Sequence, residues 1–154
     1  MSMEIFTLSD RRLGSIAEWQ HAIDASRLAL TLPTDIRIEE LHGFLPIRVG
    51  DAATGFECAH RDAAEVIRFY GTIDFGREWR HALVFYWQGF EEGAAACMAA
   101  AAYAKAADGV VFDPQESIVL SPQRAIEYAN EFKADIPRMK ELVREGLRKM
   151  GRAV

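Results

Sequence analysis

The chain has 154 residues, of which 50% are hydrophobic and 27% charged, and its net charge is −5. This composition indicates a single globular domain over residues 1–154 and excludes a disordered chain. The acidic balance argues against nucleic acid as a partner, because phosphate binding needs a concentrated positive surface. The longest segment without charge, residues 93–104, is shorter than the roughly 18 residues that cross a membrane, so we expect no membrane partner.

The cysteine content and the N-terminus predict a cytoplasmic protein. Two cysteines, Cys58 and Cys97, are too few for a disulfide framework and suit a reducing compartment. The first ten residues lack the basic start and the apolar run of a signal peptide. Arginine outnumbers lysine, which is typical of GC-rich bacterial genomes, so a bacterial origin is expected.

The first half of the chain predicts short strands separated by helices with marked N-termini. Alternating or apolar residues favour strands over residues 3–8, 28–32, 44–49 and 55–60. Helices are expected to begin at Ser15 and Asp62, because each is followed three residues later by a glutamate, the spacing of a capping box. The segment 34–43 fits a strand as well as a short helix.

In the second half, residues 81–87 are apolar on both alternating faces, which is typical of a strand in the middle of a covered sheet. The alanine-rich helix after Gly89 is apolar around most of its circumference, so it must pack between other elements or at a subunit interface. Residues 113–116 predict the turn of a hairpin, and Ser121 the start of another helix. A last, amphipathic helix is expected over residues 137–151.

These elements predict an α+β fold. We expect a single mixed, largely antiparallel sheet of about six strands, packed by four or five helices.

Charge is concentrated at the C-terminal end. Residues 138–152 hold six basic and two acidic side chains, a net charge of +4, which leaves −9 for the rest of a chain whose total is −5. Cations are favoured at the C-terminal end of a helix by its dipole, which is one explanation. The alternatives are an acidic ligand and a homodimer formed by this helix or by the alanine-rich one.

A cysteine, a histidine and a glutamate lie close together in residues 55–60. On a strand, Cys58 and His60 face one side and Glu57 faces the other. A structural zinc site needs four ligands, usually as two local pairs, and no second pair exists, so we predict no metal. Cys58 is expected to pack inward, with His60 and Glu57 as candidate binding residues.

Residues 74–81 form the second cluster of chemically active side chains, in a loop that feeds the central strand. Trp and Arg are common anchors of protein interfaces, and loops held by a rigid sheet often carry recognition residues. The alternative is an ordinary solvated loop whose tryptophan covers the core. The candidate binding residues are Asp74, Arg77, Trp79, Arg80 and His81.

Residues 79–117, which hold a tryptophan, an alanine-rich helix and the stretch ADGVVFDPQES, resemble a segment of small uncharacterised bacterial proteins. Some of these are similar to the immunity proteins of contact-dependent or secreted toxins. The resemblance implies a small acidic cytosolic domain that binds a protein, and it assigns no catalytic residue.

The leading hypothesis is therefore a non-enzymatic binding protein without a cofactor, an immunity-like or adaptor domain. Its acidic surface near the 74–81 loop would steer a basic partner such as a nuclease toxin. The alternative is a small enzyme or small-molecule-binding protein with a pocket near Glu57, His60, Arg80 and His81.

Overall fold

A computed structural model describes residues 3–152, and within them the chain forms one antiparallel sheet of seven strands with four α-helices and a short 3-10 helix. The elements in chain order are β1 (Met3–Ser9), α1 (Ile16–Ala25), β2 (Leu30–Thr31), the 3-10 helix η1 (Ile38–Glu40), β3 (His42–Val49), β4 (Ala52–Asp62), α2 (Ala63–Phe69), β5 (His81–Trp87), α3 (Phe90–Ala107), β6 (Val110–Asp113), β7 (Ile118–Leu120) and α4 (Pro122–Arg152). The predicted α+β class is confirmed, and every strand pair is antiparallel.

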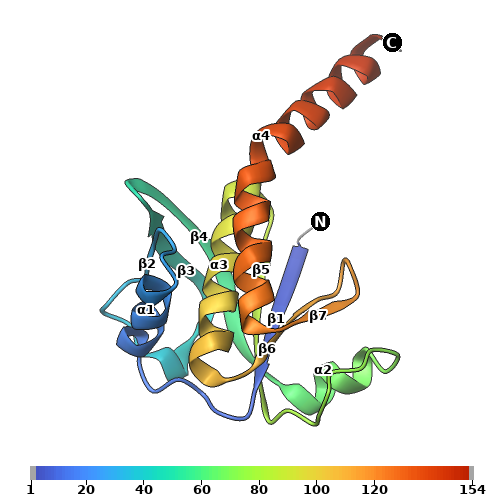
Figure 1. Cartoon of the computed structure of the whole chain (residues 1–154). Helices are drawn as coiled ribbons and strands as arrows, with labels where there is room; N and C mark the ends of the chain where they lie inside the picture. Colours follow the sequence, from blue (N-terminus) through green and yellow to red (C-terminus); the bar gives the residue numbers. More distant parts are fainter. Residues whose placement is uncertain (1–2, 153–154) are drawn as a thin grey trace.

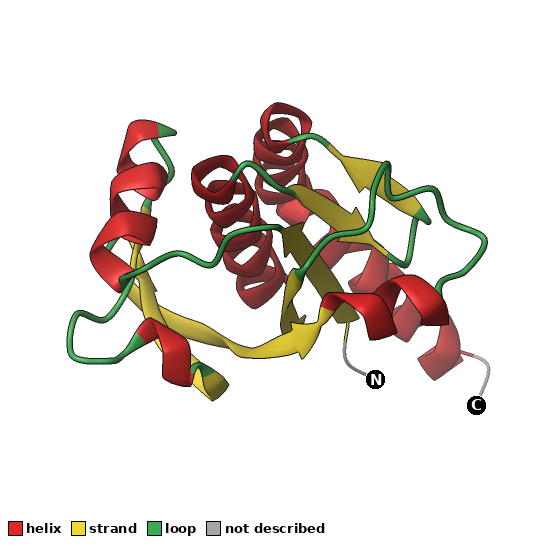
Figure 2. Cartoon of the chain, turned by 90° about the horizontal axis from the view of Figure 1, so that it is seen from below, coloured by secondary structure: helices red, strands yellow, loops and turns green. Residues whose placement is uncertain are grey.

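The sheet has the strand order β2-β3-β4-β5-β1-β6-β7, so β5 is its central strand. Helices α1, α3 and α4 cover one face, where Leu83 and Phe85 of β5 are buried, while α2 and the loop after it cover the other, where Ala82 and Val84 are buried (Figures 1 and 2). Burial on both faces explains the uninterrupted apolar sequence of β5 and confirms its predicted central place.

Helix α3 forms the middle of the larger core. Small side chains let it approach the sheet, α1 and α4 closely, and its residues from Gly93 to Ala104 are all buried. The indole N–H of Trp19 in α1 donates to the Ala99 carbonyl oxygen at 2.9 Å, and its ring packs edge-on against Tyr103. Of the two sequence hypotheses, packing between other elements of the same chain is the observed one.

Local capping explains two helix starts. The Ser15 hydroxyl accepts from the Glu18 backbone N–H at 3.1 Å, and Asp62 Oδ1 accepts from the Ala64 backbone N–H at 3.0 Å. Strand boundaries agree less well, since the strand expected over residues 28–32 shortens to β2, and η1 occupies part of the segment 34–43.

Helix α4 corrects the expected helix over residues 137–151. The structure joins that segment to the helix beginning at Pro122, and Pro137 lies inside the resulting 31-residue helix. Proline has no N–H to donate and its ring crowds the preceding turn, so an interior proline commonly kinks a helix instead of ending it. Figure 1 shows that the axis of α4 changes direction about midway. No helix in the described part of the chain combines the length and the apolar character that a membrane crossing requires.

Candidate functional site

The polar side chains around Cys58 are separated by the pleat of β4. Cys58 is buried beneath α3, whereas Ala59 belongs to the core on the α2 side. Glu57, which is itself exposed, therefore lies on the same face as Ala59, and His60 lies on the face of Cys58. His60 Nε2 lies 2.9 Å from the Ile38 carbonyl oxygen, which can only accept, so the imidazole donates and ties η1 to the sheet.

The 74–81 loop is held by its own contacts. The indole N–H of Trp79 donates to the Phe75 carbonyl oxygen at 2.9 Å, and its half-buried ring packs on the core beneath α2. The guanidinium of Arg77 lies 5.0 Å from the centre of the Trp79 ring and pairs with Asp10. Asp74 accepts from the backbone N–H two residues later, at 2.8 Å, in a turn. Trp79 thus covers the core, which is what the alternative hypothesis of an ordinary solvated loop predicts.

Glu57 is separated from the other three side chains of the alternative pocket, whereas His60 and His81 lie on one face of the sheet, two positions apart in the β4–β5 register. Glu57 lines a cavity of about 180 Å³ that contains none of the other three. His60 lies on the opposite face of the sheet, and Arg80 is exposed just before β5. Burial, together with the nearby Arg12 and Arg80 guanidiniums, lowers the pKa of His81, so this imidazole is largely neutral at neutral pH.

Neither cysteine is poised for nucleophilic chemistry. Burial raises the pKa of Cys58 and of Cys97, so both remain thiols at neutral pH. Among residues 3–152, no group of three or more His, Cys, Asp or Glu side chains could hold a metal ion.

A larger cavity lies where α4 crosses the ends of β1 and β5. Its volume is about 630 Å³, within the range of about 300–1,000 Å³ that is usual for binding pockets. Its walls include the aromatic rings of Trp87, Tyr128 and Phe132 and the thioethers of Met3 and Met139. We call it the α4 cavity.

The walls of the α4 cavity depend on a glycine in α3. A β-carbon at Gly93 would lie 2.4 Å from Trp87 Nε1 and 2.9 Å from Phe132 Cζ. Such distances are too short for real contacts, so the missing side chain is what lets the two rings pack against the helix backbone. A glycine directly before the alanines of residues 94–96 was the sequence signal for this close approach, since alanine is the better helix former.

A buried carboxylate lies at one wall of the α4 cavity. Asp113 is 3% exposed, its Oδ1 accepts from the Gln115 backbone N–H at 2.9 Å, and its other oxygen accepts from the Tyr128 hydroxyl. In the amide orientation that satisfies its neighbours, the Gln115 side chain also donates to Asp113, at 2.7 Å. Burial and the hydrogen bond to Asp113 raise the pKa of Tyr128, so its hydroxyl stays a donor.

The α4 cavity is acidic. Asp113, Glu116, Glu131 and Asp135 line it, and no lysine or arginine does within the described residues. Two of these carboxylates have partners outside the cavity, since Glu131 pairs with Arg124 at 3.0 Å and Asp135 with Arg138 at 2.6 Å. The combination of aromatic walls and carboxylates suits a ligand that is both apolar and cationic.

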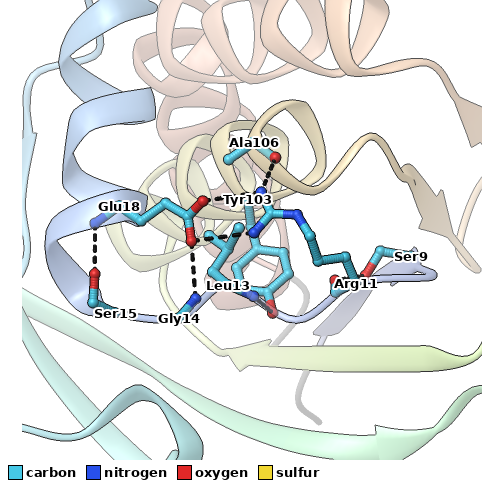
Figure 3. A network of polar contacts seen from close by, with 8 residues as sticks. All are labelled: Ser9, Arg11, Leu13, Gly14, Ser15, Glu18, Tyr103 and Ala106. Atoms are coloured by element: carbon cyan, nitrogen blue, oxygen red, sulfur yellow. Dashed lines mark hydrogen bonds and ion pairs between the residues drawn. The ribbon is translucent and has the colours of Figure 1, made fainter.

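A polar network at the other end of α3 has a structural role (Figure 3). The Arg11 guanidinium donates to Glu18 at 2.9 Å and to the Ala106 carbonyl oxygen at 2.6 Å. Tyr103 accepts from the Leu13 backbone N–H at 3.2 Å. The hydrogen bond from Arg11 lowers the pKa of Glu18. These contacts fasten the loop before α1 to the last turns of α3.

No protein family model, curated protein or solved structure matches the chain. The choice of a functional site therefore depends on the geometry of the described residues.

Proposed function

We propose that the chain is a non-enzymatic binding protein that recognises a basic protein partner, as an immunity or adaptor protein of a bacterial cytoplasm does. The α4 cavity is the site at which it binds. The observation that carries the proposal is a cavity of about 630 Å³ that combines three aromatic walls with four carboxylates.

The chemistry of the cavity selects the partner. Lysine and arginine side chains bring an apolar stem and a charged end, so they can pack on the rings of Trp87 and Phe132 while their charges meet Glu116. The acidic remainder of the chain adds long-range attraction, which speeds the encounter with a basic surface.

The 74–81 loop is a less suitable acidic surface. Within it, Asp74 and Glu78 are balanced by Arg77 and Arg80. Its largest side chain, Trp79, is committed to the core and to the hydrogen bond with the backbone of the same loop. We therefore assign the partner-binding surface to the α4 cavity.

The test uses the proteins encoded beside this gene, since toxins and their immunity proteins are produced together. Each neighbour is coexpressed with the chain, and the affinity of any copurifying protein is measured by titration calorimetry. Glu116→Lys, an exposed cavity residue, should weaken binding roughly tenfold or more, because it reverses a charge that faces the partner.

Glu78→Lys is the matched control, because it makes the same charge change at an exposed position of the 74–81 loop. It should leave the affinity unchanged. A partner that responds to Glu78→Lys but not to Glu116→Lys would remove the α4 cavity as the site. Finding no binding partner among the neighbouring gene products would remove the function itself.

A further inference from the structure

The apolar stripe of α4 runs unbroken along one face of the whole helix, with members three or four residues apart. They are Ala125, Ala129, Phe132, Ile136, Met139, Val143, Leu147 and Met150. The first two members are 2% and 0% exposed, because they pack against α3. Val143, Leu147 and Met150 are 50%, 62% and 68% exposed. The apolar face is therefore continuous along α4, but other elements of the chain cover only its first part and leave Val143, Leu147 and Met150 exposed.

The covering ends because α3 is too short to accompany α4. The two helices run antiparallel, and α3 begins at Phe90, where Glu91 pairs with Lys140 of α4. The twelve residues from 141 to 152 span about 18 Å at about 1.5 Å per residue, beyond the start of α3. Figure 1 shows this end of α4 projecting past the rest of the molecule. We call residues 138–152 the α4 tail.

The charge of the α4 tail is complementary to that of the α4 cavity. The tail carries a net charge of +4 and the rest of the chain −9. Arg138 and Lys140 pair with Asp135 and Glu91 of the same chain, so the projecting residues 141–152 supply +2 of this charge. The cavity lies beside the first half of the same helix and is lined by carboxylates. Tyr128 is the first and Met139 the last residue of α4 that lines it. The twelve residues from 128 to 139 extend over about 18 Å, which equals the length of the projecting residues 141–152.

We propose that the α4 tail docks in the α4 cavity of a second copy of the chain. The equal lengths of residues 141–152 and 128–139, and the opposite charges of tail and cavity, fit an isologous dimer with antiparallel α4 helices. Met139, which belongs to both the tail and the cavity wall, then lies near the two-fold axis. In this arrangement Leu147 of one copy lies beside Phe132 of the other, and Met150 beside Tyr128. The inference rests on the proposed function, because it assigns to the same cavity a ligand of the same chemistry.

Self-docking regulates the proposed binding. A second copy and a basic partner would occupy the same cavity, so the dimer is a blocked form and the monomer the binding form. Because dimerisation depends on protein concentration, the affinity for a partner should fall as the concentration of the chain rises.

Two other coverings of the α4 tail fit the observations less well. A dimer formed by tail against tail would bring together two segments of net charge +4. An anionic membrane would attract the basic tail, but binding to a membrane would leave the acidic α4 cavity empty.

The test is the mass of the full-length protein in solution, measured by sedimentation velocity over a wide range of concentration. The wild-type chain should be a dimer. Leu147→Glu should weaken the dimer roughly tenfold or more, because it puts a charge in the apolar contact. Glu116→Lys should weaken it as well. Phe69→Glu is the matched control, since Phe69 is an 80% exposed apolar residue on α2, across the sheet, and should leave the dimer intact.

Three outcomes would overturn the proposal. One is a wild-type monomer at every concentration. Another is a dimer that Leu147→Glu dissociates while Glu116→Lys does not, which indicates tail against tail. The third is a monomer that cosediments with phosphatidylserine vesicles through the tail. If monomeric Leu147→Glu still binds the basic partner, the proposed function survives the loss of self-docking, so the two failures are distinguishable.

Discussion

The two halves of α4 carry the same apolar repeat but have opposite surroundings. Along the first half, Ala129 is fully buried against α3, while along the second Leu147 is 62% exposed. The sequence pattern of the helix does not change between them, apart from a higher density of basic residues after Pro137. Helical periodicity therefore specifies which face of a helix will be covered, whereas the neighbouring elements decide whether the same chain covers it.

The largest expected difference between the two halves is in stability. Ala129→Glu would place an unpaired carboxylate between α4 and α3, so we expect the free energy of unfolding to fall by about 3–5 kcal/mol. Leu147→Glu should change it by less than about 0.5 kcal/mol when measured on the monomer, because the site is exposed. Urea denaturation measures the free energy of unfolding of both variants. Similar losses of stability in the two would contradict the difference between the halves of α4.

Glycine to alanine substitutions should have opposite effects on stability at Gly93, where α3 packs against the cavity walls, and at Gly146 in the exposed half of α4. Gly93→Ala should destabilise by about 1–3 kcal/mol, because its β-carbon would meet Trp87 and Phe132. Gly146→Ala, in the α4 tail, has open space around its β-carbon and should stabilise by about 0.5–1 kcal/mol through helix propensity. Thermal and urea denaturation measure both changes. If Gly93→Ala were as stabilising as Gly146→Ala, the close contact of α3 with the cavity walls would not exist.

The smallest effect is expected at the junction of the two halves. The hydrogen bond from Lys140 lowers the pKa of Glu91 from its ordinary value of 4.5. Stability from a depressed carboxyl pKa is present above the unfolded value and is lost as the pH falls through the folded one. Glu91→Gln should therefore destabilise by less than about 1 kcal/mol at neutral pH, and the difference should vanish in acid and at high salt. A difference that is independent of pH would contradict the ion pair.

Local features of the fold could be predicted because their causes are local. The capping residues Ser15 and Asp62 act on backbone groups within three residues, and the apolar run of β5 reflects burial on both faces of the same strand. The alternation in β4 also placed Glu57 and His60 on different faces. The break expected at Pro137 was wrong, because a helix can continue through a proline that loses one hydrogen bond and kinks the axis.

The α4 cavity could not be predicted, because its walls come together only in the folded chain. Trp87 ends β5, Asp113 ends β6, and Phe132 lies in α4, so no spacing in the sequence relates them. Gly93 was the one local sign of a close approach, and it did not say what approaches. The sequence instead drew attention to the 74–81 loop, whose charged and aromatic residues mainly hold the loop itself.

The proposed dimer places the α4 tail of one copy in the α4 cavity of the other. The most direct measurement is an isotope-filtered nuclear Overhauser experiment on an equal mixture of methyl-labelled and unlabelled full-length chains. We expect intermolecular contacts from the Leu147 methyls to the Phe132 ring and from the Met150 methyl to the Tyr128 ring. Contacts confined to residues 142–150 of both copies, or no intermolecular contact at concentrations that give a dimer, would contradict it.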